Sequence, residues 1–333
     1  MRISFEDMRN EFKRVLIKKG CSEAVADEAA ESFTSTSCDG VYSHGVNRFP
    51  RVIEYIEKGH INPEATPERI DAFGALERWD GKLGLGNLMA KYAMDRTISL
   101  ADAFGIGCVA LRNNNHWMRG GEYGWQAANS GYIGICWTNT QPNMPAWGAI
   151  DQRIGNNPLI FALPRKKGHI VADLAMSQFS YGKMEKYKMD NKTLPVPGGY
   201  DSAGNLTQDP NEIEESGKVL PIGFWKGSGL SIVLDLLASM LANGNTTNDL
   251  SEFGEDEYAV SQVFIAISPN RLGNMDEIEE SINESIKYIK KSQTENESDE
   301  IYFPGEQSAK TRRENLKNGI PVNAEIWEKI KSL

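Results

Sequence analysis

The chain has four histidines, and one of them, His44, lies in the stretch 42–49, whose residues are Tyr-Ser-His-Gly-Val-Asn-Arg-Phe. An imidazole can donate or accept a proton near neutral pH. Arg48, four positions later, can hold a carboxylate through two parallel hydrogen bonds. Together these residues predict an acid/base group beside an anion anchor, which a small oxygenated anionic substrate would need. A Ser-His-Gly tripeptide is also common in turns that have no chemistry, so this stretch alone leaves both interpretations open.

A second group of polar residues, 112–121, follows an apolar run at 107–111 that predicts a strand. It contains His116, Arg119 and three consecutive asparagines. Loops at strand ends are where binding and catalytic groups are commonly placed. We therefore favour a site here over a polar turn with an internally satisfied histidine, because the cations stand out in an acidic chain.

Two glycine-rich loops precede predicted helices. Residues 223–229 lead into a helix at 230, and their backbone N–H groups together with Lys226 could hold a pyrophosphate while Trp225 stacks on a ring. The alternative is a loop that needs glycine only for tight packing. Residues 84–90 imitate a dinucleotide fingerprint, but the preceding residues are polar and Met89 occupies the third glycine position. We interpret that second loop as the start of a helix at 87–103.

Other polar residues support weaker hypotheses. Asp173, at the end of a predicted strand 170–174, could orient a histidine, hold a ribose hydroxyl or cap the next turn, of which the cap is the simplest. The turn 154–158 could bind through its amides or be structural. The loop 201–210 lacks the ligand spacing of a calcium site, and no metalloprotease, P-loop or nucleophile-elbow motif occurs. The sequence predicts a metal-free, non-hydrolytic protein.

Bulk composition narrows the class of protein. The 333 residues carry a net charge of −10, which disfavours nucleic acid and anionic membrane surfaces as partners. The longest apolar stretch, 230–241, is interrupted by polar residues, and no membrane span is expected. The N-terminus has no signal-peptide pattern, and four scattered cysteines are typical of reduced thiols. We expect a cytoplasmic protein.

The elements that must position these groups follow from periodicity. Helical patterns occupy 4–37 with a break at Gly20, then 52–59, 275–292 and 324–333. Pro50 either begins the third helix or kinks a longer one, and only the longer helix would place His44 and Arg48 on one face. β-rich runs lie at 107–111, 132–137, 159–163, 170–174 and 260–267. The prediction is an α+β (α/β) fold, in which 1–75 and about 268–333 form a discontinuous helical domain around an α/β domain at 76–267.

Several of these stretches occur, in the same order, in one known family. They are Ser43-His44-Gly45-Val46 with Arg48, Asn115-His116, Gly155 with Asn157-Pro158, Asp173 with Ala175, Lys226-Gly227 with Gly229, and Pro304-Gly305-Glu306. Together, over essentially the whole chain, they resemble the malate/L-lactate dehydrogenase type 2 family. The resemblance implies a nicotinamide-binding α/β domain distinct from the Rossmann fold, a helical domain built from both chain ends, and a homodimer with the cofactor near the subunit interface.

The resemblance also implies roles for particular residues. His44 would be the proton donor in an NADH-dependent reduction of a 2-oxo (diketo) sugar acid, with NADPH a possible cofactor. The cofactor would contact His169, Ile170, Val171, Ala172, Asp173, Leu174, Ala175, Trp225, Lys226, Pro304, Gly305 and Glu306. We expect a protonated His44, with substrate contacts from Ser43, Arg48, His116 and Arg119, where either arginine could hold the carboxylate.

Two departures from the family pattern concern the substrate. Asn156 stands where a threonine is common, and the residues at 141–145 differ from the small apolar residues usual there. Two alternatives remain at this point. One is a malate-, lactate- or ureidoglycolate-type 2-hydroxy acid dehydrogenase, and the other is a non-catalytic sugar-acid binding protein.

Overall fold

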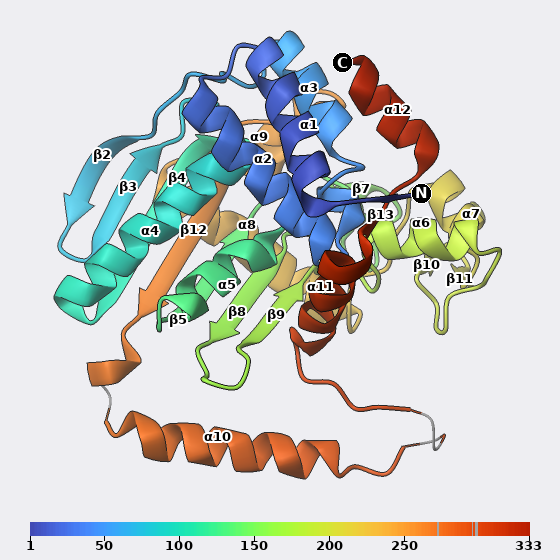
Figure 1. Ribbon diagram of the computed structural model, residues 1–333. Coiled ribbons are helices and arrows are strands. Elements are labelled where there is room, and N and C mark those ends of the chain that lie inside the picture. Colours follow the sequence, from blue (N-terminus) through green and yellow to red (C-terminus); the bar gives the residue numbers. More distant parts are fainter. Residues whose placement is uncertain (272, 295, 297–298) are drawn as a thin grey trace.

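A computed structural model describes residues 1–271, 273–294, 296 and 299–333. Its centre is a seven-stranded sheet with the strand order β2-β3-β4-β12-β5-β8-β9 (Figure 1). Only β3 and β4 are parallel, and every other neighbouring pair is antiparallel. The strands are β2 (Glu68–Phe73), β3 (Leu76–Asp80), β4 (Ile106–Asn114), β5 (Ile133–Thr138), β8 (Leu159–Leu163), β9 (Ile170–Leu174) and β12 (Val260–Ile267). A doubly wound Rossmann sheet is parallel, so the predicted non-Rossmann α+β class is confirmed.

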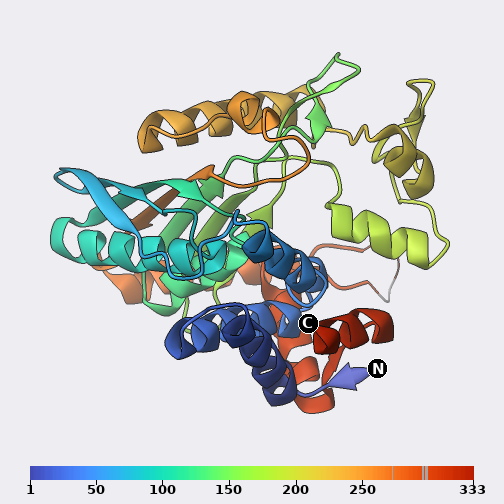
Figure 2. The same ribbon diagram turned by 90° about the horizontal axis from the view of Figure 1, so that it is seen from above.

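Helices cover both faces of this sheet (Figure 2). α4 (Gly86–Phe104) and α5 (Gly120–Asn129) pack on one face, and α8 (Trp225–Ala242) packs on the other. The Trp137 indole on β5 donates to the Leu234 carbonyl of α8 at 3.0 Å. The site must therefore be built at an end of the sheet, since both of its faces are filled.

The two ends of the chain pack together beside α4 and α5. They contribute α1 (Phe5–Lys18), α2 (Glu23–Cys38), α3 (Phe49–Glu57), α11 (Glu306–Asn318) and α12 (Ala324–Ser332). The aromatic ring of Phe12 stacks on that of Phe49 with 4.2 Å between centroids, and Phe33 meets the Phe49 ring edge-on. A two-stranded ladder pairs β1 (Arg2–Ile3) with β13 (Ile320–Pro321). The ends thus share one apolar core, while the division into two domains stays a prediction.

Two local predictions differ from the structure. β3 occupies residues that the sequence analysis interpreted as polar and turn-like, and β2 places the edge of the sheet before the predicted boundary at residue 76. Glu77 is buried in β3 because the Arg96 guanidinium and the Trp79 indole both donate to its carboxylate. A buried carboxylate with such partners interrupts the apolar alternation that indicates a strand, and β3 was therefore not predicted.

The stretch around His44 is divided into two elements. His44 ends a short 3-10 turn, η1 (Tyr42–His44), and α3 begins at Phe49 with Arg48 as its N-cap residue and Pro50 in the first turn. Pro50 therefore begins the helix, which is the position where a missing N–H costs least. The single longer helix is excluded, so His44 and Arg48 reach the same region through a turn between them.

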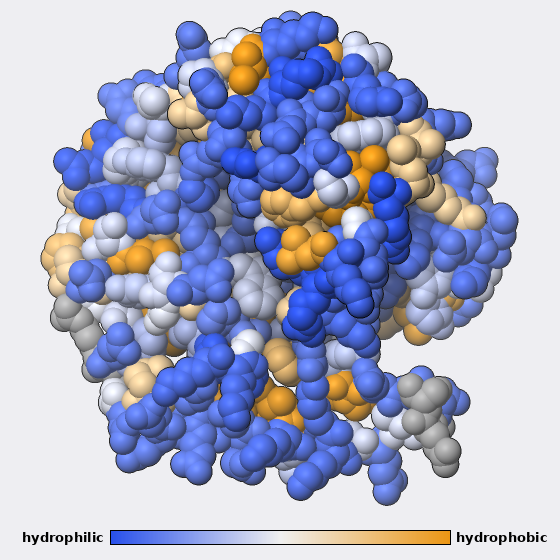
Figure 3. Space-filling model, in the orientation of Figure 1, coloured by the Kyte–Doolittle hydropathy of each residue, from blue (hydrophilic) through white to orange (hydrophobic). Residues whose placement is uncertain are grey.

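The remaining elements lie around this body. α10 (Met275–Lys290) lies apart from the sheet at the bottom of Figure 1 and has no buried residue. In Figure 3 the face on which α10 is seen is mostly hydrophilic, with small separate apolar patches. The other short elements are β6 (Met144–Pro145), β7 (Gln152–Ile154), α6 (Tyr181–Met189), β10 (Gly199–Tyr200), β11 (Leu206–Thr207), α7 (Pro210–Ser216), α9 (Thr247–Ser251) and η2 (Pro269–Arg271).

α8 is more apolar than the sequence analysis expected of it. Among the described residues it is the one helix long and apolar enough to cross a membrane by length and composition, and a third of it is buried. Its Asp235 carboxylate accepts from the Asn139 amide and from the Thr247 backbone N–H, both at 2.8 Å. These bonds attach α8 to the ends of β5 and α9, as in a helix that belongs to the body of the protein.

Candidate active site

One end of the sheet gathers most of the predicted site residues. Opposite residues in the ladders are Asn114 and Val260, Gln262 and Thr138, Trp137 and Leu159, and Leu159 and Leu174. The chain segments that follow β4, β5 and β9 therefore leave at the same end as those that precede β8 and β12. This register brings His116, Gln141, Asn156, Ala175 and Glu257 to one side of the molecule.

The turn η1 brings His44 against this end. The rings of His44 and His116 stack with 5.4 Å between centroids and 23° between planes. Gly45 lies tightly against α2, where Ser37 Oγ accepts the Val46 N–H at 2.8 Å. The start of α6 packs from the other side, since a Cβ on Gly182 would lie 2.6 Å from Ser43 Oγ. Glycines on both sides thus let the backbone approach closely enough to fix the histidine.

His116 is held as a neutral hydrogen-bond donor. Its Nδ1 accepts the Met118 backbone N–H at 3.0 Å, so this nitrogen carries no proton and Nε2 carries the hydrogen. Burial, followed by the charge of Arg48, holds the pKa of His116 well below its usual value. The neighbouring Asn115 amide donates to three backbone carbonyls, those of His60, Leu83 and Gly84. The loop after β4 is therefore rigid, and the imidazole cannot rotate without losing a bond.

The glycine loop 84–90 contributes to this rigidity. A strand does precede it, but Gly86 packs directly on the His116 and Asn115 carbonyls, and any Cβ there would clash. The glycine is required by packing, so the loop seats His116, and the interpretation of 84–90 as the start of a helix is confirmed by α4.

The surroundings of His44 also favour its neutral form. Ser43 Oγ lies 3.0 Å from its Nδ1. Burial, reinforced by the charges of Arg48 and Arg119, lowers the pKa of His44 to about 4. A protonated His44 is expected for the complex with substrate, and this stays a prediction. A bound anion would oppose both arginine charges and raise the pKa again.

The two arginines offered as carboxylate anchors differ in their partners. Among the described residues none accepts a hydrogen bond from Arg48 or forms an ion pair with it, although it is half-buried and burial lowers its pKa. Arg119, only 6% exposed, forms an ion pair with Asp39, which also binds Arg312 at 2.8 Å. Arg48 is the arginine left with unused donors beside the histidines.

Beside Arg119 lies a buried acidic group that the sequence analysis did not identify. Glu122 accepts the hydroxyls of Ser32 and Thr36 at 3.0 and 3.3 Å. Burial raises the pKa of Glu122 to about 7, in spite of those hydroxyls and the nearby Arg119 charge. Nothing in the sequence distinguishes this glutamate from the other carboxylates, because its environment comes from α2, 90 residues earlier.

Asp173 caps a helix, although not the one expected. Its Oδ2 accepts the Gly121 N–H at 2.8 Å, in the first turn of α5. The capping interpretation of this carboxylate therefore holds, with a helix from an earlier segment of the chain.

The predicted cofactor segments meet along the edge strand β9. The Val171 N–H donates to the Pro304 carbonyl at 3.0 Å. Gly305 has φ of +93°, and a Cβ there would lie 3.1 Å from Val171 N and 3.2 Å from the Trp125 ring. The buried Trp125 Nε1 has no hydrogen-bond partner among the residues that the structure describes. A cavity of about 440 Å³ opens beside this indole, lined also by Arg119, Glu122, Asn129 and Arg312 among others.

The predicted cradle at 223–229 continues from the same edge. Just beyond β9, the Ile222 N–H donates to the Met176 carbonyl at 2.8 Å, which brings the start of α8 alongside. The N–H groups of Lys226 and Gly227 bond to the Gly223 and Ile222 carbonyls, so they are not free to bind an anion. What remains available is the Lys226 ammonium, which lies 6.0 Å from the ring centre of the exposed Trp225.

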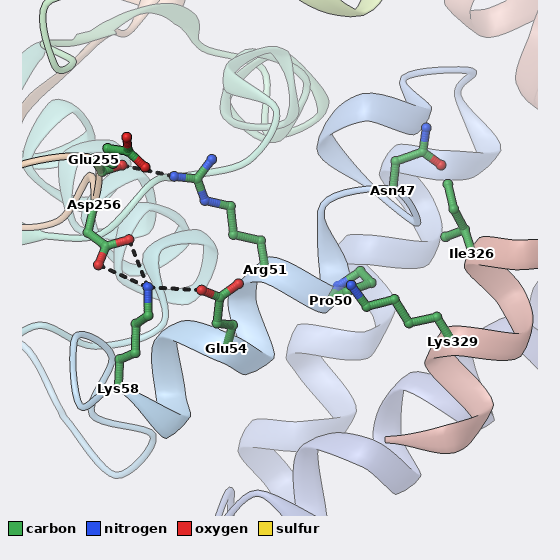
Figure 4. A pocket seen from close by; sticks show the side chains of 9 residues that line it. All are labelled: Asn47, Pro50, Arg51, Glu54, Lys58, Glu255, Asp256, Ile326 and Lys329. Atoms are coloured by element: carbon green, nitrogen blue, oxygen red, sulfur yellow. Dashed lines mark hydrogen bonds and ion pairs between the residues drawn. The ribbon is translucent and has the colours of Figure 1, made fainter.

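A second cavity lies beside α3 but has none of the predicted site residues in its lining. It measures about 450 Å³, and Figure 4 shows Lys58 joined to Glu54 and Asp256, and Arg51 bonded to the Glu255 carbonyl, on one side of it. Its charges already neutralise one another. We therefore take the end of the sheet beside His44 as the candidate active site.

Comparison with known proteins agrees with this geometry. The sequence model for malate/L-lactate dehydrogenase matches residues 3–331. The chain belongs to this family. This dehydrogenase is 49% identical, over 333 residues and 100% of both chains, to the 2,3-diketo-L-gulonate reductase of Pasteurella multocida, and 47% identical over the same span to that of Haemophilus influenzae.

Solved structures of the family share its fold. The malate dehydrogenase of Entamoeba histolytica superimposes with a TM-score of 0.93 at 26% identity, covering 100% of this chain and 96% of that one. The malate dehydrogenase of Pyrococcus horikoshii gives 0.89 at 30% identity, with 99% and 93% covered. This dehydrogenase is thus an oxidoreductase of the malate/L-lactate dehydrogenase type, as the sequence motifs predicted.

Proposed function

We propose that this dehydrogenase reduces 2,3-diketo-L-gulonate to 3-dehydro-L-gulonate with NADH. The observation that carries the proposal is Arg48, a half-buried cation without a partner among the described residues, beside the stacked pair His44 and His116. Unpaired buried charges are costly, and they are found where a ligand completes them. The curated relatives with this name, 47–49% identical over the full chain, support the same substrate class.

Each residue has a role that follows from its surroundings. Arg48 binds the substrate carboxylate through its free guanidinium N–H groups. When NADH is bound, it supplies the hydride that the carbonyl carbon accepts. His116 donates from Nε2 to the carbonyl oxygen and stabilises the charge that develops there, since its Nδ1 is occupied by Met118. His44 delivers the proton to that oxygen, and Ser43 orients its ring through Nδ1.

The low pKa of His44 is part of this proposal. Two arginine charges add to burial in lowering it to about 4. The substrate carboxylate neutralises Arg48, and the developing alkoxide adds a second negative charge beside the imidazole. Both changes favour the protonated ring, so His44 becomes a competent acid only when substrate is present.

The residues along β9 fit a nicotinamide cofactor. The close approach of Gly305 to Val171 and Trp125 makes a surface that any side chain would fill, and the Trp125 Nε1 is a donor without a partner. The segments 169–175, 225–226 and 304–306 would hold the dinucleotide, with Lys226 near its phosphates. NADPH remains an alternative cofactor.

We also propose that the protein is a homodimer that pairs through α8. Six large apolar side chains of this helix are at least 38% exposed, namely Leu230, Ile232, Val233, Leu236, Leu237 and Met240. Such a contiguous apolar face is typical of an interface between subunits. It adjoins Trp225 and Lys226, which would place the cofactor near the second subunit. The four unpaired cysteines support a cytoplasmic location.

The test is oxidation of NADH and of NADPH by the purified protein with a panel of 2-oxo acids. We expect 2,3-diketo-L-gulonate to give the highest kcat/KM, and His44→Asn to abolish turnover while NADH binding, followed by fluorescence, survives. Faster reduction of oxaloacetate or pyruvate would favour a malate- or lactate-type enzyme, which the fold of the solved malate dehydrogenases also permits. Near-normal turnover by His44→Asn would exclude His44 from the chemistry.

A further inference from the structure

The end of the sheet that carries the histidines also carries a group of amides that the proposed mechanism does not use. Asn156 precedes β8, and Thr140 and Gln141 follow β5. Adjacent strands lie about 4.8 Å apart, so the order β12-β5-β8 places Glu257, Thr140 and Asn156 next to one another. The amides are therefore neighbours of the reacting groups.

Two sets of contacts join these amides to the candidate active site. On one side, Glu257 accepts the Gln141 backbone N–H at 3.0 Å, and its charge acts on Arg48. On the other, the Tyr181 hydroxyl donates to the Asn143 carbonyl at 2.7 Å, and the next residue, Gly182, packs on Ser43. The amide group thus lies between the anchor for the carboxylate and the turn that carries His44.

Within this group, Asn156 is held in one orientation by its oxygen. Its Oδ1 accepts the Asn143 Nδ2 at 2.9 Å and the Thr140 hydroxyl at 3.3 Å. Its backbone carbonyl accepts the Met176 N–H at 2.8 Å, which fixes the main chain as well. Because Oδ1 faces Asn143 and Thr140, Nδ2 on the other branch of the amide is directed away from both. No described residue accepts from that Nδ2, and the side chain is partly exposed.

The neighbouring asparagine, Asn157, shows what a structural role looks like at the same turn. It is fully buried, its Oδ1 accepts the Thr140 N–H at 2.9 Å, and its Nδ2 donates to Ser231. All of its capacity is used within the protein. Asn156 differs in keeping both N–H donors free.

This arrangement is energetically unfavourable for the Asn143 side-chain oxygen. The Asn143 Oδ1 is buried and no described residue donates to it, and an unsatisfied buried acceptor is unfavourable. Its Nδ2 is committed to the Asn156 oxygen. The residue therefore positions Asn156 and does not itself reach a ligand.

We propose that Asn156 is a specificity residue, which donates from Nδ2 to a hydroxyl or keto oxygen on the chain of the substrate beyond the reacting carbonyl, and that Asn143 positions it. The proposal rests on the proposed function for the reacting end of the substrate and adds how its polar tail is recognised. An amide that faces outward with two donors suits a polyhydroxylated acid, whereas a threonine here would offer one hydroxyl that the Thr140–Asn143 pair can satisfy internally.

The experiment compares a hydroxylated with a short substrate. For wild type, Asn156→Ala, Asn156→Thr and Asn143→Ala we measure kcat/KM with NADH for 2,3-diketo-L-gulonate and for pyruvate. Loss of one hydrogen bond lowers the ratio of the two values about 3- to 10-fold in the Asn156 variants. Asn143→Ala lowers it in the same direction, and the double variant is no worse than Asn156→Ala alone, because one residue acts through the other. Asn248→Ala is the matched control, since Asn248 is exposed on α9 and makes no side-chain hydrogen bond.

A second readout separates this inference from the proposed function. Calorimetry measures the binding of L-gulonate and L-lactate to the same proteins, with no turnover required. A wild-type preference for L-gulonate that disappears in Asn156→Thr supports the inference even if 2,3-diketo-L-gulonate is not reduced, in which case the proposed function fails alone. An equal preference in wild type and Asn156→Thr, or a kcat/KM ratio unchanged in both Asn156 variants, overturns it.

Discussion

The Arg48→Met variant tests whether the Arg48 charge serves ligand binding or the stability of the fold. Arg48 has no hydrogen bond or ion pair with a described residue, and burial already lowers its pKa. Methionine retains most of the apolar stem. Removing an unpaired, largely desolvated charge should leave the free energy of unfolding unchanged or raise it by about 1 kcal/mol.

The catalytic activity of Arg48→Met should fall, in contrast to its stability. The guanidinium and the substrate carboxylate would form a desolvated charge pair, and truncating one partner of such a pair costs about 2–5 kcal/mol. We therefore expect kcat/KM for 2-oxo acids to fall about 30-fold or more. The assay is NADH oxidation with pyruvate and pyruvamide, because the variant should lose the preference of the wild type for the carboxylate. Unfolding by urea gives the stability of the same preparations.

Arg119→Met is the matched control. Arg119 is ion-paired with Asp39 and almost fully buried, so its loss leaves Asp39 with only Arg312 and should destabilise the fold by about 2–3 kcal/mol. Two results would refute the reasoning: an Arg48→Met protein that is markedly less stable than the wild type, or one that retains both its activity and its preference for pyruvate over pyruvamide.

Three further predictions concern charge and assembly. The pKa of folded His44 is about 4 against an ordinary 6.5, so the unfolded chain takes up a proton as pH falls through 6.5 while the folded chain does not. Between pH 7 and 4 the free energy of unfolding of the wild type, measured with urea, should therefore fall by up to about 3 kcal/mol more than that of His44→Asn. Glu122 should make the free energy of unfolding depend on pH in the opposite direction. Its pKa is raised to about 7, so its contribution to stability is present below pH 4.5 and is lost as pH rises through 7. Glu122→Gln should therefore remove a decline in stability of about 2–3 kcal/mol between pH 5 and 9, and identical pH profiles for the two proteins would contradict this. Met240→Asp, on the exposed face of α8, should convert the dimer to a monomer in light scattering, whereas Tyr288→Asp on the exposed α10 should not.

Much of the fold could be predicted because its strands are apolar runs between polar turns. The runs at 159–163, 170–174 and 260–267 coincide with β8, β9 and β12. α1 was equally accessible, since Ser4 accepts the Asp7 N–H as its cap. α11 was missed because Ala309 and Leu316 are its only apolar residues, which leaves no helical periodicity to detect.

The site could be predicted only as a set of residue types. His44, Arg48, His116 and Arg119 were all singled out, yet the sequence does not say which arginine is free. That difference depends on Asp39 and Arg312, which are brought to Arg119 from segments 80 and 193 residues away in number but adjacent in space. The low pKa of His44 could not be predicted for the same reason, since burial and neighbouring charges are properties of the folded chain.

The pairing of β1 with β13 also sets the order in which this enzyme is completed during synthesis. His44 is made early, but the segment in front of it is held by α11, where the Asn315 amide donates to the Cys38 carbonyl at 2.9 Å and Arg312 binds Asp39. Contacts between such distant parts of a chain form slowly, because a very long loop must close first. A nascent chain can therefore assemble its sheet before it has catalytic activity. It becomes active only when residues 306–333 leave the ribosome and dock.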